Sequence, residues 1–380
     1  MKKVAIIDPL GAHGSSHHLY LFGQSIGLIN AGMDVSLYTN IKTDDPKIAG
    51  LNFFSFYKDI FKSRFDIING FRWIIGSIYS IFHAKHSQVS VFHFHLFHTN
   101  ILVLFNLILV KLLFGRVVLT IHDVDSLSNT KNSALISHFI YKLTDSILTH
   151  NEFSKLNFIE SNPNVPAPVS VVPHGNYIPF INVRNNQKES RLHLGLPKDK
   201  TILLFFGMIK KVKGLDTLLH AFKSVVKENP DTVLLIAGKP WKNDFDMYQQ
   251  IITKNNLSKN IILHTNFIAH KDVEYYYCAS DLVVLPYKRI YQSGVLMMAL
   301  SYQKAVLVSN LPPLKEIIVD NKNGFLFKSG DATSLSAKLN FILTNKKEIE
   351  RVRKKGNLLI SSKFSWDAIG VLTNQIYKNL

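Results

Sequence analysis

The sequence contains a single cysteine, Cys278, in 380 residues. One thiol cannot form a disulfide framework, and it cannot build a zinc site from several cysteines. Charged residues make up 19% of the chain and hydrophobic residues 47%, a composition that excludes an intrinsically disordered protein. The apolar run at the N-terminus is too short for a signal peptide and is predicted to be a first strand. We therefore expect a cytoplasmic, enzyme-sized globular protein.

Long apolar segments are also scarce. The most apolar stretch, 101–115, is interrupted by Asn106 and Lys111. A membrane-spanning helix needs about 20 apolar residues, so a buried helix is predicted here. The segment 57–86 mixes aromatic residues with five Lys and Arg. It suits either a helix on a membrane surface or helices that pack on a sheet and expose a basic face.

Acidic residues are outnumbered, with 27 Asp and Glu against 44 Lys and Arg, which gives a net charge of +17. Residues 1–183 carry +3 of this charge and residues 184–380 carry +14. Such an excess attracts anions, among them nucleic acid, phosphorylated small molecules and anionic lipid. The chain has no RNA-binding aromatic motif, zinc finger or arginine-rich helix, so no nucleic-acid partner is expected. The lysines are spread thinly, as on an ordinary solvated surface.

Short apolar segments alternate with longer helical patterns, which is typical of parallel βαβ units. The length exceeds the roughly 250–300 residues that one core serves, so we expect an α/β protein with two doubly wound domains. The predicted division is an N-terminal domain at 1–180, a polar linker at 181–197, a C-terminal domain at 198–362 and a closing helix at 363–380. Strands are predicted at 4–7, 34–38, 89–95, 117–122, 146–149, 169–172, 201–206, 233–237, 261–264, 282–286, 305–309 and 324–327.

The loop after the first strand contains Gly11, His13 and Gly14 and precedes a helical pattern at 17–32. Glycines let a backbone approach a ligand closely, and a helix N-terminus favours an anion. The loop does not match G-x-G-x-x-G, which disfavours an oxidoreductase with a nicotinamide cofactor. From these residues alone, a binding site and a simple turn are both open.

The second predicted domain opens in the same way, with lysines on a loop between a strand and a helix. Gly207 and Gly214 flank Lys210, Lys211 and Lys213. The ammonium groups could neutralise a diphosphate while the glycines permit close approach, although a solvated lysine cluster is the alternative. The P-loop pattern is absent.

A third loop follows the strand at 282–286 and leads into another helix through Ser293, Gly294 and Val295. The first N–H groups of that helix would form a second site for an anion. Met297 and Met298 are expected to pack in the core.

These motifs, in this order, resemble the donor domain of the family-four (group 1) glycosyltransferases, which have the GT-B fold. The resemblance covers the second half well and the first half loosely. It implies two facing Rossmann-like doubly wound domains, with a nucleotide-sugar donor in the cleft against the C-terminal domain and the acceptor against the N-terminal one. The segments that carry it are 172–175, 207–222, 236–238, 279–286, 292–295, 311–326 and 364–366.

The resemblance implies roles for individual residues. Lys213 matches the lysine that contacts the donor diphosphate, and the loop from Gly11 to Gly14 matches the loop that faces the reacting sugar. His122, in the segment Thr-Ile-His-Asp, matches a histidine that commonly faces the transferring sugar, and it is the candidate catalytic residue. A hydrogen-bonded structural histidine is the alternative.

The chain departs from the family at three positions. Met208 stands where the family usually has an arginine, so Lys210 or Lys211 would have to replace that diphosphate contact. Ile290 and Met298 stand where it has two glutamates, and a thioether cannot replace a carboxylate that binds ribose hydroxyls. Donor binding is therefore expected to be altered or to rely on backbone groups.

The predicted function is transfer of a hexose from a nucleotide-diphosphate sugar to a glycan or lipid-linked acceptor, in the assembly of a cell-surface polysaccharide or glycolipid. No cofactor and no metal are expected, because lysines and helix N-termini can stabilise the leaving diphosphate. The location would be cytoplasmic, with an anionic membrane surface as a further partner on the inner face. The alternatives are a nucleotide-sugar-binding module without turnover and a nucleotide-sugar epimerase of similar fold.

Overall fold

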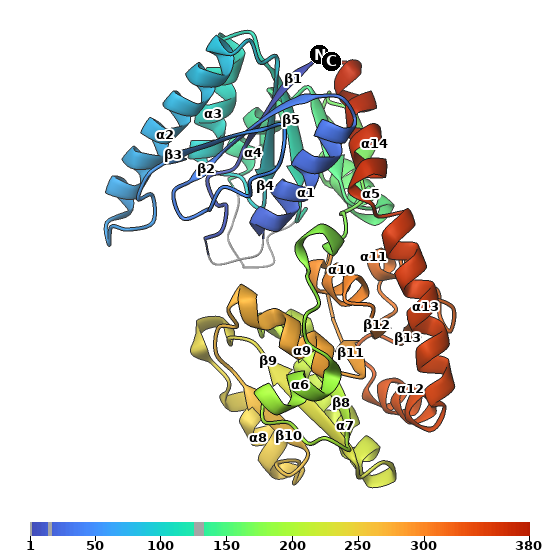
Figure 1. Cartoon of the computed structure of the whole chain (residues 1–380). Helices are drawn as coiled ribbons and strands as arrows, with labels where there is room; N and C mark the ends of the chain where they lie inside the picture. The colour runs from blue at the N-terminus through green and yellow to red at the C-terminus, as the bar shows by residue number, and fades with distance from the viewer. Residues whose placement is uncertain (1, 14–16, 125–132) are drawn as a thin grey trace. The chain divides into compact units, whose positions relative to one another are not determined.

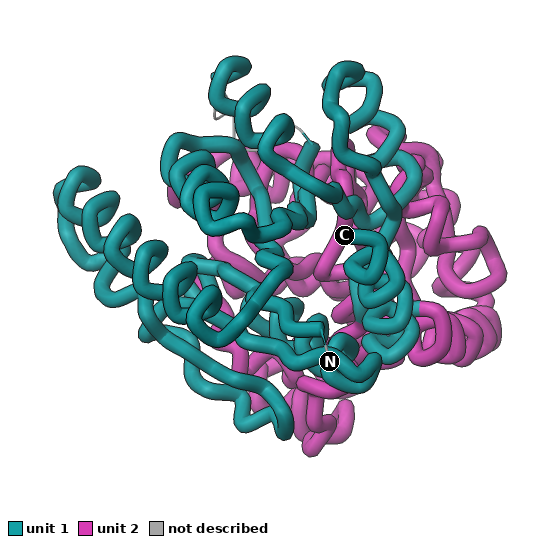
Figure 2. Tube along the Cα trace, turned by 90° about the horizontal axis from the view of Figure 1, so that it is seen from above, with its two compact units in different colours: residues 1–175, 364–380 teal, residues 176–363 magenta. Residues whose placement is uncertain are grey.

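The computed structural model describes residues 2–13, 17–124 and 133–380. The chain divides into two compact units, coloured separately in Figure 2. The N-terminal unit comprises residues 1–175 and 364–380, and the C-terminal unit comprises residues 176–363. Each unit is built on a parallel sheet with helices packed against it (Figure 1), so the predicted α/β fold class is confirmed.

The sheet of the N-terminal unit has the strand order β3-β2-β1-β4-β5-β6-β7, and its neighbouring strands are parallel. The order reverses between β1 and β4, where Val4 lies opposite Val91. The strands are β1 (Lys3–Ile7), β2 (Asp34–Asn40), β3 (Leu51–Tyr57), β4 (Val91–Leu96), β5 (Arg116–Ile121), β6 (Ser146–Thr149) and β7 (Val169–Val171). The helices are α1 (His17–Asn30), α2 (Asp66–His86), α3 (Ile101–Leu112), α4 (Ala134–Lys142), α5 (Glu152–Ser161) and α14 (Trp366–Lys378).

The sheet of the C-terminal unit has the order β10-β9-β8-β11-β12-β13, and its order reverses between β8 and β11. The strands are β8 (Thr201–Phe206), β9 (Thr232–Ala237), β10 (Ile261–His264), β11 (Leu282–Leu285), β12 (Ala305–Ser309) and β13 (Phe325–Phe327). The helices are α6 (Gln187–His193), α7 (Leu215–Glu228), α8 (Asp246–Lys254), α9 (Val273–Ala279), α10 (Gly294–Ser301), α11 (Pro312–Lys315), α12 (Ala332–Thr344) and α13 (Lys346–Ser362). Short 3-10 turns occur at η1 (Ile178–Phe180), η2 (Lys211–Lys213), η3 (Trp241–Asn243) and η4 (His270–Asp272).

The local sequence explains these elements. Central strands of a parallel sheet are covered on both faces, so they are continuously apolar, and β8 and β9 are largely buried for this reason. Helix α7 buries one face through apolar residues at helical spacing, namely Leu215, Leu218, Leu219, Phe222 and Val225.

The C-terminal helix α14 belongs to the N-terminal unit and crosses α1. Ser365 caps it by accepting a hydrogen bond from the N–H of Ala368. The helices approach closely at glycines, because a Cβ on Gly27 would lie 2.1 Å from the carbonyl oxygen of Trp366. A Cβ on Gly370 would lie 1.9 Å from the carbonyl oxygen of Gly27. Only glycine fits at these two positions.

The prediction of a linker at 181–197 is wrong in the structure. This segment contains α6, which Asn186 and Glu189 cap reciprocally. Arg191 of α6 is buried and donates hydrogen bonds to the carbonyl oxygen of Ala279 and the carboxylate of Asp281. The segment is therefore part of the C-terminal unit, and the boundary follows Gly175 instead of residue 180.

Two further elements differ from the sequence expectations. Strand β3 was not predicted; it lies at the sheet edge, where most of its side chains are half-buried and leave no clear apolar pattern. Helix α3 was predicted to be buried, but it buries only one face, through Leu104, Leu107 and Val110. Ile101, Ile108 and Leu112 on its other face are exposed.

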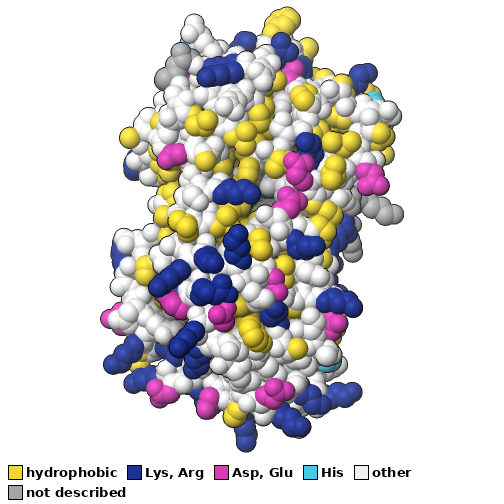
Figure 3. Space-filling view, turned by 90° about the vertical axis from the view of Figure 1, so that its right-hand side faces the viewer, with side chains coloured by type: hydrophobic (Ala, Val, Ile, Leu, Met, Phe, Trp, Pro, Cys, Tyr) yellow, Lys and Arg dark blue, Asp and Glu magenta, His cyan; other side chains and the backbone are white. Residues whose placement is uncertain are grey.

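One face of the molecule agrees with the expected dispersal of charge. On the face drawn in Figure 3, Lys and Arg side chains are widely spread, with Asp and Glu side chains between them. Among the described residues, no helix combines the length and the apolar character that crossing a membrane requires.

Candidate functional site

The loops after β8 and β11 meet where the strand order of the C-terminal unit reverses, which is the usual ligand position in open α/β sheets. Gly207 follows β8 with φ +101°, and a Cβ on it would lie 3.3 Å from Cγ2 of Val295. Gly207 therefore lies against the start of α10. The structure brings these two predicted residues together.

The lysine loop is attached to the end of β11 at Gly214. This residue has φ +69°, and a Cβ on it would lie 1.8 Å from the carbonyl oxygen of Pro286. The N–H of Lys288 donates to the carbonyl oxygen of Val212 at 2.8 Å. Glycine at 214 is thus required both by its backbone conformation and by the close approach of the loop.

The two lysines predicted to bind the donor have different neighbours. The Nζ of Lys213 lies 3.9 Å from the centroid of the Tyr287 ring, close to the start of α10. The Nζ of Lys210 lies 4.3 Å from the centroid of the Trp241 ring. Met208 is exposed on the same loop and adds no charge. Of these two lysines, Lys213 is therefore the one that contacts the loop after β11, through Tyr287.

The start of α10 is built around Ser293. Its Oγ accepts a hydrogen bond from the N–H of Leu296 at 3.1 Å and donates to the hydroxyl of Tyr287 at 3.4 Å. The N–H groups of Gly294 and Val295 belong to the first turn, where a helix offers them no internal acceptor. With Lys213 nearby, this turn has the chemistry of an anion site.

The positions of the two family glutamates are apolar and internal. Ile290 and Met298 are each 7% exposed, and Met297 is buried beside them in sequence. The core packing predicted for Met297 and Met298 is confirmed. Neither Ile290 nor Met298 presents a hydrogen-bonding group to a nucleotide, so any contact to the ribose must come from other atoms.

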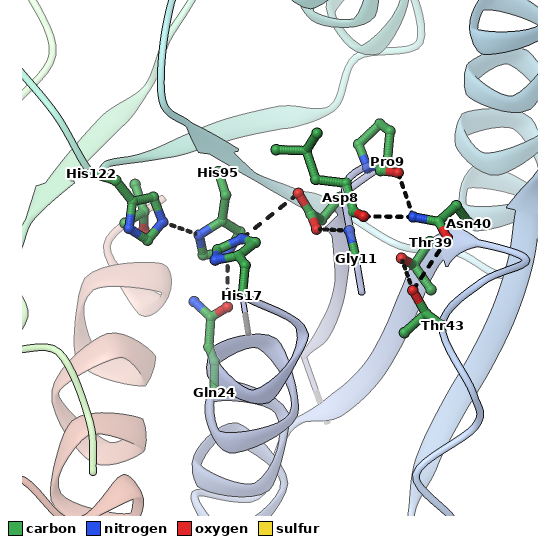
Figure 4. A network of polar contacts seen from close by, with 12 residues as sticks. Asp8, Pro9, Gly11, His17, Gln24, Thr39, Asn40, Thr43, His95 and His122 are labelled. Carbon is green, nitrogen blue, oxygen red and sulfur yellow. Dashed lines mark hydrogen bonds and ion pairs between the residues drawn. The ribbon is translucent and has the colours of Figure 1, made fainter. Parts of the chain in front are cut away.

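In the N-terminal unit, the loop after β1 is held rigidly. Gly11 has φ +47°, and its N–H donates to Oδ2 of Asp8 at 2.7 Å. A Cβ on Gly11 would lie 2.0 Å from Oγ1 of Thr43. The side-chain amide of Asn40 donates to the carbonyl oxygens of Pro9 and Leu10 (Figure 4). Burial raises the pKa of Asp8 to about 7, against the lowering effect of its backbone hydrogen bonds.

Of the other residues predicted in this loop, His13 is described by the structure. His13 stacks on Phe61, with 3.9 Å between ring centroids and 11° between ring planes. Gly14 lies outside the described residues. The loop therefore places His13 against the segment between β3 and α2, while Asp8 turns toward α1, where its Oδ1 lies 3.8 Å from Nε2 of His17.

His122 follows β5 and is only 3% exposed. Its Nε2 lies 3.0 Å from Nδ1 of His95, and its Nδ1 lies 3.2 Å from Nε2 of His150. Both ring nitrogens thus have partners within the N-terminal unit. Contact with a sugar would require His122 to give up one of them.

His122 is part of a larger histidine cluster, most of which the sequence analysis missed. Figure 4 shows His95 between Gln24 and His122, with His17 beside it. His93 stacks on His95 and contacts the hydroxyl of Tyr377. The available signal was that 12 of the 16 histidines occur before residue 184, several of them at predicted strand ends.

Burial keeps these imidazoles neutral. It lowers the pKa of His17 to about 3 and that of His95 and His122 well below the usual value. The positive charge that neighbouring imidazoles would carry adds to this effect for His95 and His122. At neutral pH these rings therefore have one N–H and one lone pair each.

Residues 186–358 match the family model of glycosyl transferases group 1. Spore coat protein SA of Bacillus subtilis is 26% identical over 202 residues, which are 50% of this chain and 52% of that protein. Lipopolysaccharide 1,2-N-acetylglucosaminetransferase of Salmonella typhimurium is 27% identical over 263 residues, which are 65% of this chain and 68% of that protein. The matched part of the chain thus spans about half to two thirds of these relatives.

The fold is shared along the full chain. Anabaena Alr3699/HepE, whose crystal structure was determined in complex with UDP-glucose, superimposes with a TM-score of 0.77 at 15% identity and covers 100% of both chains. The chain has the GT-B fold, residues 186–358 match the model of glycosyl transferases group 1, and the chain resembles the glycosyltransferases of that group.

Proposed function

We propose that the chain is a hexosyltransferase that moves a sugar from a nucleotide-diphosphate donor to a glycan or lipid-linked acceptor. The observation that carries the proposal is that Lys213 and Ser293, the N-cap residue of α10, both contact Tyr287 within the segment that matches the group 1 model. The UDP-glucose bound by the structural neighbour supports a nucleotide-sugar donor.

The proposed site would act on the leaving group. Sugar transfer leaves a nucleoside diphosphate with growing negative charge and a sugar carbon with cationic character. The Lys213 ammonium and the N–H groups of Gly294 and Val295 would stabilise that charge, with Gly207 leaving room for the phosphates. We propose that this transfer needs neither a metal nor a cofactor, because the stabilising groups belong to the chain itself.

The N-terminal unit would supply the sugar-facing groups. We propose His122 as the residue at the transferring sugar, and the loop with Gly11 and His13 as a wall for the reactants. Because both ring nitrogens of His122 are engaged, its interaction with a sugar hydroxyl would replace the contact to His95 or His150. Those two histidines would then position the His122 ring.

An acceptor attached to a lipid is supported by the surface of α2. Ile67 is 88% exposed, and Phe71, Tyr79 and Phe82 are exposed on the same helix. Exposed Lys58, Lys62 and Arg64 precede this helix. An apolar helix face with adjacent basic residues suits the surface of an anionic membrane. We propose peripheral attachment on the cytoplasmic face.

A role in cell-surface polysaccharide or glycolipid assembly is consistent with this acceptor. It is supported by the similarity to the Salmonella enzyme that acts on lipopolysaccharide. Acceptors of that kind are built on lipids, so a protein that transfers sugars to them gains from contact with the membrane.

The first experiment is thermal stabilisation of the chain by UDP-, GDP- and ADP-sugars. A ligand that binds the folded state raises the unfolding temperature by mass action. One nucleotide class should stabilise the wild-type chain and should stabilise Lys213→Ala less. Incorporation of labelled sugar from the donor into acceptors in an extract would then show transfer. Stabilisation by none of the three classes would contradict the proposal.

A binding module without turnover is the second candidate. It is favoured by Met208, Ile290 and Met298, which replace charged residues of the family with groups that cannot hold a diphosphate or ribose. Such a module would show the same stabilisation by a nucleotide sugar but no sugar release with any acceptor. An epimerase would instead convert the donor sugar without acceptor.

A further inference from the structure

Three histidines of the N-terminal unit, two of them buried and His17 half-buried, come together from separate segments. His17 begins α1, His95 lies in β4 and His122 follows β5. One ring nitrogen of each lies within 4.8 Å of the corresponding nitrogens of the other two. The cluster lies at the carboxyl ends of β1, β4 and β5, where the strand order of this sheet reverses.

The tautomers of His95 and His122 can be inferred from hydrogen-bond partners at two ends of a row of contacts, Gln24 and Val172. The carbonyl oxygen of Val172 lies 3.1 Å from Nδ1 of His150 and can only accept, so His150 donates there and accepts at Nε2. His122 therefore donates through Nδ1 and has its lone pair on Nε2. At the other end, Oε1 of Gln24 lies 2.9 Å from Nε2 of His95, which donates and leaves its lone pair on Nδ1.

The two lone pairs defined in this way face each other. Nδ1 of His95 and Nε2 of His122 are 3.0 Å apart, a separation at which two acceptors repel. The row from Gln24 to Val172 has four contacts that each need one proton, whereas three neutral imidazoles supply three. A cation bound by both lone pairs removes this conflict.

The surroundings match a transition-metal site. Ligating histidines usually donate their other N–H to a carbonyl or a similar acceptor, as His95 does to Gln24 and His122 does to His150. Two nitrogens that bind one Zn²⁺ at about 2.0–2.1 Å in tetrahedral geometry are roughly 3.3 Å apart, close to the observed separation. His17 would be the third ligand, and Oδ1 of Asp8 lies 3.8 Å from its Nε2.

The geometry points to a three-histidine site, formed by His17, His95 and His122, for a divalent transition metal such as Zn²⁺ or Co²⁺. Imidazole nitrogens suit these ions, and the site would link α1 to the ends of β4 and β5. The site is distinct from the Lys213 loop of the C-terminal unit. A metal on Nε2 of His122 would leave its Nδ1–H, now paired with His150, as the group that could turn to a sugar hydroxyl. The proposal does not depend on the proposed function.

Co²⁺ titration of the full chain, after treatment with a chelator, tests the site directly. Tetrahedral Co²⁺ has intense visible d–d absorption, so we expect these bands to saturate at one equivalent and to disappear when Zn²⁺ is added. His17→Gln and His95→Ala should each abolish the bands. His86→Ala removes an exposed histidine of α2 and should leave them unchanged. Circular dichroism without metal checks that each variant is folded. If His95→Ala does not fold, His17→Gln alone tests the site.

Two results would overturn the proposed site. If the side-chain amide of Gln24 is rotated by half a turn, it donates to His95, whose Nδ1–H then donates to His122, and the lone-pair conflict is absent. The wild-type chain would then give no d–d bands at stoichiometric Co²⁺. Bands that persist in both His17→Gln and His95→Ala would show that the metal binds elsewhere. Either result removes the proposed site.

Discussion

The ammonium of Lys213 lies 3.9 Å from the centroid of the Tyr287 ring, and the hydroxyl of the same tyrosine accepts a hydrogen bond from Ser293. A cation–π contact of this kind contributes roughly 0.5–2 kcal/mol. Because Tyr287 is buried, it fixes the position of Lys213 relative to Ser293, the N-cap residue of α10. A diphosphate bound by the lysine would therefore also meet the N–H groups of α10.

Lys213→Ala should reduce transfer more than any other substitution on the lysine loop. Loss of one charge-assisted contact to the leaving phosphate should cost on the order of 2–4 kcal/mol of transition-state stabilisation, about 30- to 900-fold in kcat/KM. Lys210→Ala is the matched control, because Lys210 lies against Trp241 and should have a smaller effect. A near-normal rate for Lys213→Ala with a large loss for Lys210→Ala would show that the roles of the two lysines are reversed.

His122→Ala should lower kcat while leaving the KM for the donor nearly unchanged, because the proposed contact is to the sugar at the reacting centre. Steady-state kinetics at varied donor concentration measure this division. His138→Ala replaces an exposed histidine of α4 and should retain full activity. An unchanged kcat in His122→Ala would reduce His122 to a structural member of the cluster.

The N-terminal unit should lose stability as the pH falls below about 6.5. Burial lowers the pKa of His93 and His174 to about 3 and that of His150 to about 4, from 6.5. The unfolded chain then binds more protons than the folded chain, so each histidine lowers the free energy of unfolding by about 1.4 kcal/mol per pH unit. The raised pKa of Asp8 acts in the opposite direction between about pH 4 and 7, but it is one group against several histidines.

Urea denaturation at pH 7.5, 6.5 and 5.5 measures this dependence. Trp366 reports on the N-terminal unit, and Trp241→Phe removes the tryptophan of the C-terminal unit from the signal. His93→Gln should reduce the slope below pH 6.5 by about 1.4 kcal/mol per pH unit. A free energy of unfolding that does not change over this range would disprove the neutral state of the buried histidines.

Gly27→Ala should destabilise the N-terminal unit, because the new Cβ would lie 2.1 Å from a backbone oxygen of α14. Overpacking of this kind costs roughly 1–3 kcal/mol. Gly70→Ala is the control: it lies in α2 with no atom within 4 Å of the added Cβ, and should stabilise the helix by about 0.5–1 kcal/mol. Thermal unfolding of the two variants compares them directly. Equal stability would mean that α14 does not contact α1 in this way.

The chain should sediment with anionic vesicles and not with zwitterionic ones, and high salt should release it. Each basic residue near an anionic surface contributes about 1 kcal/mol, which salt screens. Changing Lys58, Lys62, Arg64 and Arg72 to Ser should weaken binding at low salt, and Ile67→Ser should weaken it as well by removing an exposed apolar contact. Absence of vesicle binding at low salt would favour a soluble acceptor.

The sequence was sufficient for the fold class and for most strands, because buried parallel strands are recognisable as short apolar runs. It also supplied the residues of the proposed C-terminal site, because glycines and lysines on a loop between a strand and a helix are typical of phosphate binding. Gly207, Lys213 and Ser293 lie on the loops that follow β8 and β11. These two strands are neighbours where the strand order reverses, which is where ligands usually bind.

The histidine cluster and the unit boundary were decided by tertiary structure alone. His17, His95 and His122 are far apart in sequence, and only the alignment of strand ends in the sheet brings their rings together. The tautomers inferred for His95 and His122 rest on the oxygen atoms of Gln24 and Val172, which no local pattern reveals. The polar composition of 181–197 predicted a linker, but the hydrogen bonds of a buried arginine there stabilise a helix of the C-terminal unit. Propensity and periodicity act over a few residues, whereas these contacts join groups that meet only after the sheets have formed.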